Sequence, residues 1–97
     1  MIIVQETFVA KPGNASKLAK LFKESMSADK HFRQVMTDMT GQYNRVVALF
    51  EYNDMDEFNK SYQEMMNPPP EMKKAMEKMQ GYTEMYQTGS REIFRTW

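Results

Sequence analysis

Apolar residues alternate along the first segment of the chain. Over Ile2–Ala10, one face of an extended strand carries Ile2, Val4, Glu6 and Phe8. A period of two, built from β-branched and aromatic residues, predicts a strand. A Pro-Gly pair follows, which predicts a turn directly after the strand.

The apolar spacing then changes to that of a helix. Leu18, Phe22 and Met26 recur at intervals of four, while the lysines of this segment lie away from that stripe. This pattern predicts an amphipathic helix of about four turns. We expect Asn14 or Ser16 to cap its start, because a short side-chain oxygen accepts a free backbone N–H.

Two further strands are predicted in the middle of the chain. The alternation over residues 31–40 is weak, which is typical of an edge strand. Residues 43–52 contain the most apolar run, Val46-Val47-Ala48-Leu49-Phe50, with apolar side chains on both faces. Such a strand is expected to be buried on both sides, in the middle of a sheet.

A second helical region follows and is interrupted by prolines. Asp54 and Glu57 have the spacing of a capping box and predict a helix start. Its expected inward stripe consists of Phe58, Tyr62 and Met65 or Met66. The prolines at 68–70 fit the first turn of a new, short helix. The expected inward stripe of that helix consists of Met72, Ala75, Met76 and Met79.

Residues 82–97 are predicted to form the last strand, with a break at Gly89-Ser90. The element order is therefore β-α-β-β-α-β, with the second helix broken by prolines. This order predicts an α+β, ferredoxin-like fold, in which one four-stranded antiparallel sheet carries both helices on one face. A length of 97 residues allows a single domain, 1–97.

Composition narrows the function classes. Thirteen Lys and Arg balance thirteen Asp and Glu, which argues against nucleic-acid binding. The absence of cysteine excludes disulfides and thiol catalysis. No apolar run reaches the length of a signal peptide core or a membrane span. We therefore expect a cytoplasmic protein with no membrane partner.

The face of the sheet opposite the helices is not polar enough for solvent. Val47 and Leu49 are expected on the other face of the strand from Val46, Ala48 and Phe50, so one of the two sets lies on the uncovered side. An exposed apolar patch of that size is uncommon in a monomer. We expect a homodimer that packs sheet against sheet.

Three stretches resemble the dimeric α/β-barrel superfamily. They are residues 8–13 (Phe-Val-Ala-Lys-Pro-Gly), residues 46–52 with the following Asp54 and Phe58, and residues 91–95. The similarity is greatest to NIPSNAP-like proteins and to the antibiotic-biosynthesis-monooxygenase-like group. It implies a dimer whose two sheets close into one barrel, with the C-terminal strand reaching over the partner subunit. It also implies a pocket between sheet and helices or inside the barrel.

Members of this superfamily include cofactor-free oxygenases, haem-degrading monooxygenases, lactone isomerases and proteins without known activity. The haem-degrading members carry an Asn where this sequence has Glu6 and a Trp where it has Phe50. The resemblance therefore does not favour haem degradation, and we expect no cofactor.

Two residues are candidates for acid–base chemistry. His31 is the only histidine, and imidazole exchanges protons near neutral pH. Its simpler interpretation is an exposed residue at the edge of a strand. Glu6 is a carboxylate among apolar neighbours, where burial would favour a general base. Its simpler interpretation is an ion pair with a cross-strand arginine, for which Arg45, Arg91 and Arg95 are available. One histidine without cysteine excludes a structural zinc site.

Aromatic side chains supply candidates for a ligand pocket, and the alternative is that they form the core and the dimer interface. The candidates are Phe50, Tyr43, Tyr52, Tyr62 and Tyr86, together with Tyr82 and Phe94. Eleven methionines would suit Cu(I) or an adaptable recognition surface. Because Met72, Met76 and Met79 have helical spacing and no Cys or His lies near them, we expect core packing and no metal.

The sequence thus predicts a binding module for a small hydrophobic ligand. The alternative is a cofactor-independent monooxygenase or isomerase acting on a small aromatic or hydrophobic substrate. Residue patterns leave open whether the protein is an enzyme.

Overall fold

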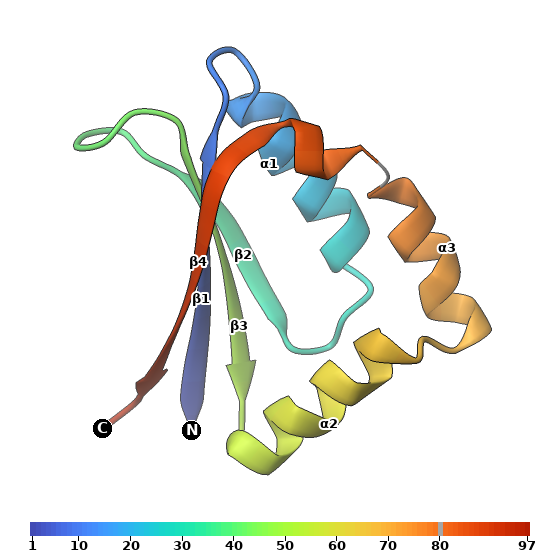
Figure 1. The fold of residues 1–97 in the computed structure, drawn as a ribbon. Coiled ribbons are helices and arrows are strands. Elements are labelled where there is room, and N and C mark those ends of the chain that lie inside the picture. Colours follow the sequence, from blue (N-terminus) through green and yellow to red (C-terminus); the bar gives the residue numbers. More distant parts are fainter. Residues whose placement is uncertain (80) are drawn as a thin grey trace.

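The computed structural model describes residues 1–79 and 81–97, and for Ala75 and Lys78 it describes the backbone alone. Its elements are β1 (Ile2–Ala10), α1 (Ala15–Met26), β2 (Phe32–Thr37), β3 (Arg45–Tyr52), α2 (Met55–Met66), α3 (Pro70–Lys78), the 3₁₀ turn η1 (Tyr82–Glu84) and β4 (Tyr86–Arg95). The predicted β-α-β-β-α-β order is confirmed, with the second helical region divided into α2 and α3 (Figure 1).

The strands form one antiparallel sheet in the order β2-β3-β1-β4, which is the ferredoxin-like arrangement. The helices all lie on one side of this sheet, and the other side has no helix over it (Figure 1). In β1 the residue Glu6 lies opposite Ala48 of β3 and opposite Arg91 of β4. This register places the side chains of Glu6 and Arg91 next to each other on the helix-covered face.

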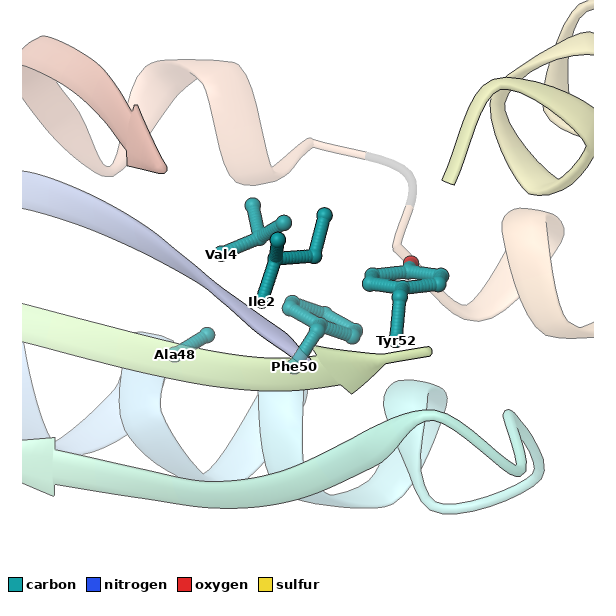
Figure 2. Close-up of a cluster of buried hydrophobic side chains, with 5 residues drawn as sticks. All are labelled: Ile2, Val4, Ala48, Phe50 and Tyr52. Atoms are coloured by element: carbon teal, nitrogen blue, oxygen red, sulfur yellow. The ribbon is translucent and has the colours of Figure 1, made fainter. Parts of the chain in front are cut away.

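The core forms on the helix-covered face of β1 and β3. Burial of β3 on both faces, as its sequence predicts, is wrong for the single chain: Val46, Ala48, Phe50 and Tyr52 are buried, whereas the residues between them are only partly covered, because no helix lies over that face. Figure 2 shows the first cluster, in which side chains from both strands stand on the same face of the sheet. It consists of Ile2, Val4, Ala48, Phe50 and Tyr52. The second cluster joins α1 to the sheet and consists of Ala10, Leu18, Phe22 and Val46. The predicted inward stripe of α1 is therefore buried at Leu18 and Phe22.

The predicted helix starts are confirmed at α2 and α3, whereas the expected side-chain cap of α1 is not formed. At α2 the side chain of Asp54 accepts a hydrogen bond of 2.8 Å from the backbone N–H of Glu57, as the capping box predicts. Asn14 occupies the N-cap position of α1, but its side chain makes no capping hydrogen bond. At α3, Pro69 is the N-cap and Pro70 the first helical residue, as expected from the missing proline N–H.

The last predicted strand differs from the structure at two points. Residues 82–84 form η1 and not strand, because Gly81 takes a left-handed φ of 87° and turns the chain. At Gly89 the strand is not broken. A Cβ at Gly89 would lie 3.2 Å from the ring of Phe8, so the glycine gives that ring room within a continuous β4.

The predicted inward stripe of the second helical region is wrong at several positions. Tyr62, Met65, Met66 and Met76 are exposed in the single chain. The physical reason is that α2 meets the sheet chiefly at the end of β3, where Phe58 packs on Tyr52 with ring centroids 5.4 Å apart. Further along the stripe, Tyr62 contacts the guanidinium of Arg91 from β4 and stays exposed. The side chain of Ala75, also predicted to point inward, lies outside the described residues.

In the described part of the chain, no helix combines the length and the apolar character needed to cross a membrane.

Candidate functional site

His31 is the centre of a polar cluster between the start of β2 and the first turn of α2. Its Nδ1 lies 3.1 Å from a carboxylate oxygen of Asp29, and its Nε2 lies 2.8 Å from a carboxylate oxygen of Glu57. The other oxygen of Glu57 accepts a 2.7 Å hydrogen bond from the amide of Asn53. On one side the imidazole stacks on Tyr52, with ring centroids 4.3 Å apart.

The interpretation of His31 as an exposed edge residue is wrong, because only 9% of it is accessible. Both ring nitrogens face a carboxylate oxygen at hydrogen-bond distance. Through these contacts His31 joins α2 to the chain entering β2, and neither ring nitrogen points to an open site.

The pKa values of two neighbours of His31, Glu57 and Tyr52, are shifted in this cluster. Hydrogen bonds from Asn53 and, to a lesser degree, from His31 lower the pKa of Glu57 below its ordinary value. Burial raises the pKa of the Tyr52 hydroxyl above its ordinary value. Glu57 is therefore ionised and Tyr52 neutral at neutral pH.

A small opening of about 270 Å³ lies beside this cluster. Its lining is mostly polar and consists of Met1, Lys30, His31, Arg33, Glu51, Tyr52, Asn53 and Glu57. Charged groups of both signs surround it, so it is a poor match for a hydrophobic ligand.

Glu6 is engaged by Arg91, one of the three arginines considered from the sequence. The guanidinium lies 2.7 Å from a carboxylate oxygen of Glu6 through both Nε and one terminal nitrogen. The same guanidinium carbon lies 5.8 Å from the ring centroid of Phe58 and 5.4 Å from that of Tyr62. Glu6, Arg91 and two rings of α2 thus form a stack between β4 and α2. Both nitrogens contact Oε1, so one of the two carboxylate oxygens of Glu6 is bound by Arg91.

A second and larger opening, of about 610 Å³, lies where α2, α3 and η1 meet. We call it the methionine groove. It is lined by Met65, Pro68, Lys73, Met76, Glu77, Met79, Gly81, Tyr82 and Thr83. Its surface is mainly apolar, and its volume is within the range of about 300–1,000 Å³ that is usual for small-molecule sites.

The five predicted pocket aromatics lie elsewhere. Phe50 is in the core, Tyr52 stacks on His31 and Tyr62 contacts Arg91. Tyr86 packs on Phe8, with ring centroids 4.9 Å apart, and Tyr43 is 84% exposed in the β2–β3 connection. Of the aromatics considered from the sequence, Tyr82 lines the methionine groove, whereas Phe94 lies exposed on β4.

Sequence reasoning assigned two groove methionines, Met65 and Met76, wrongly to the core, whereas Met79 packs against the second core cluster as predicted. The sequence shows their helical spacing, but such spacing predicts only which residues share a helix face. It does not predict whether another element covers that face. Met65 and Met76 come from different helices and line the same groove. Within residues 1–79 and 81–97, no group of three or more His, Cys, Asp or Glu side chains is arranged to hold a metal ion.

Solved structures with this fold include a NIPSNAP domain protein from Burkholderia xenovorans. It superposes with a TM-score of 0.76 over 100% of this chain and 95% of its own, at 14% sequence identity. A NIPSNAP family protein from Agrobacterium tumefaciens gives a TM-score of 0.76 over 99% of this chain and 85% of its own, at 10% identity. The chain has the fold of the NIPSNAP proteins.

A structure described as an antibiotic biosynthesis monooxygenase is also similar, with a TM-score of 0.61 over 100% of this chain and 99% of its own, at 11% identity. No family model and no curated protein matches the sequence. At these identities the likeness shows a common fold and carries no activity with it.

Proposed function

We propose that this protein is a binding module that holds a small hydrophobic ligand in the methionine groove. The observation that carries the proposal is the groove itself, an opening of about 610 Å³ with a mainly apolar lining. Unbranched thioether side chains adapt to ligands of different shape, which suits a binding site more than a rigid core. The polar opening beside His31 lacks this apolar lining.

Placing a charge in the groove should abolish binding. Met76 lines the groove and is half exposed, so Met76→Glu is expected to leave the fold intact. An apolar ligand would have to desolvate the new carboxylate, and we expect its affinity to fall at least about tenfold, or 1.4 kcal/mol. Fluorescence titration with the neutral probe N-phenyl-1-naphthylamine measures this.

The matched control is Met39→Glu, since Met39 is 94% exposed in the β2–β3 connection and lies outside the groove. Equal loss of probe binding in the two variants, or no binding by the original protein, contradicts the proposed function.

We further propose that the protein is a homodimer that packs sheet against sheet. On the face without helices, Val47 and Leu49 of β3 are only partly covered. They lie opposite Thr7 and Gln5 of β1 and diagonally next to Val9 and Ile3. A partner sheet would remove this apolar surface from water. β4 borders the same face with exposed side chains, which supports its part in the contact.

Leu49→Lys should convert such a dimer to a monomer. Leu49 lies between Gln5 and Gln34 in the middle of the open face, so the substitution would place a hydrated ammonium where the partner sheet is expected to pack. Sedimentation velocity at micromolar concentration should show half the original mass, with an unchanged circular dichroism spectrum. Gln63→Lys, on the exposed surface of α2, should stay dimeric. A monomer before any substitution contradicts the dimer.

The alternative function, a cofactor-independent monooxygenase or isomerase, is the less favoured one. Its two acid–base candidates are both engaged, Glu6 by Arg91 and His31 by two carboxylates. General-base catalysis needs a group that reaches the substrate proton. The open methionine groove supports binding without requiring either residue.

A further inference from the structure

We propose that the ligand of the methionine groove is an amphiphile with a single carboxylate, a fatty-acid-like molecule whose head group binds Lys73. This inference rests on the proposed function, because it names the ligand class of the same groove. It starts from the charged residues of the lining, Lys73 and Glu77, both of which α3 contributes.

Lys73 is available to an anion. Among the described residues, no carboxylate lies within 4.0 Å of its ammonium group, although Glu77 follows one helical turn later. A lysine that precedes a glutamate by four residues is the weaker of the two helical orientations for an ion pair. Lys73 is also near the start of α3, where the helix dipole favours negative charge.

The apolar part of the groove fits the tail of such a molecule. Met65 and Pro68 come from the end of α2 and the connection that follows, whereas Met79 and Tyr82 come from the end of α3 and from η1. The apolar residues of the lining thus come from both segments that flank α3 and from the end of α3 itself. Burial raises the pKa of the Tyr82 hydroxyl, so this ring is neutral and adds no charge to the tail region.

Glu77 restricts the head group to one negative charge. Its carboxylate lies on the same lining, one turn from Lys73, and would repel a dianion such as a phosphate monoester. A monocarboxylate can pair with the ammonium of Lys73 while it stays away from the carboxylate of Glu77. We therefore expect the groove to bind a fatty acid more tightly than a phosphate monoester with a tail of the same length.

The test compares dodecanoate, dodecanol and dodecylammonium below their micelle-forming concentrations, by isothermal titration calorimetry. We expect dodecanoate to bind tightest. In Lys73→Met, dodecanoate should bind about fivefold more weakly, the upper effect of a partly exposed ion pair, while dodecanol should change less than twofold. Lys74→Met is the matched control, because Lys74 is the next residue of the same helix and does not line the groove.

The outcomes separate the inference from the proposed function. If no probe binds, both fail. If dodecanol binds as well as dodecanoate, or if Lys73→Met weakens both equally, the groove is a hydrophobic site without a carboxylate preference and the inference fails alone. If dodecylammonium binds tightest, the head group binds Glu77 and not Lys73, and this result also overturns the inference.

Two other occupants are distinguished by sedimentation. Co-sedimentation with phosphatidylserine vesicles that Lys73→Met abolishes would make a membrane surface the partner and overturn the free amphiphile. A loss of mass on Met76→Glu would show that a second copy of the chain covers the groove, with the same consequence.

Discussion

Replacing Phe22 with alanine should lower the free energy of unfolding by about 3–5 kcal/mol, the usual cost of removing a buried aromatic ring. Phe22 is 0% exposed and packs between the sheet and the helical layer. Its ring centroid lies 4.9 Å from that of Phe8 and 6.1 Å from that of Tyr82. The substitution removes both contacts and leaves a cavity that the fixed strands cannot fill.

Urea denaturation followed by circular dichroism measures this change, with the slope against urea expected to stay constant. Tyr43→Ala is the control, since the tyrosine is 84% exposed and its removal should cost less than about 0.5 kcal/mol. A similar cost for the two variants would show that Phe22 is not the centre of the α1–sheet contact. Because Tyr82 also lines the methionine groove, Phe22→Ala should weaken probe binding as well.

Replacing His31 with alanine should lower the free energy of unfolding by about 2–3 kcal/mol, as expected for lost hydrogen bonds to charged groups. The substitution leaves the carboxylates of Asp29 and Glu57 without the imidazole that lies between them. It also removes the ring that stacks on Tyr52. Because one carboxylate precedes β2 and the other is on α2, the loss should loosen α2 from the sheet.

A double-mutant cycle with Glu57→Gln isolates the contact between the two side chains. His31 is one of the groups that lower the pKa of Glu57 in the folded protein, the amide of Asn53 being the larger cause. A lowered folded pKa stabilises the protein above the unfolded value of about 4.3 and loses that contribution as pH falls through the folded value. The cost of His31→Ala should therefore shrink on acidification. A cost independent of pH and no coupling to Glu57 would contradict the ionic cluster.

Local patterns in the sequence predict most of the sheet and much of α1. Alternation in β1 and β3 corresponds to real burial, because both strands are central and each face meets a different environment. The pattern fails at residues 82–84, where the same kind of residues forms a 3₁₀ turn. There the decisive factor is the left-handed conformation of Gly81, which an apolar pattern does not encode.

The contacts of the candidate residues were beyond sequence reasoning, since they depend on strand order and helix docking. Glu6 and Arg91 are 85 positions apart, and three arginines were available until the β1–β4 register was known. His31 and Glu57 are 26 positions apart and meet only because the first turn of α2 docks beside β2. Similarly, the methionine pattern predicted a helix face but gave no sign that this face would remain open.

The central position of β1 has a consequence for synthesis on the ribosome. β1 is made early, yet one of its two edges is paired only by β4, which is made last. Until residues 86–95 have left the exit tunnel, the nascent chain has an unpaired, apolar inner strand, a kind of edge prone to aggregation. The pairing of this edge of β1 therefore has to wait for the last of the four strands.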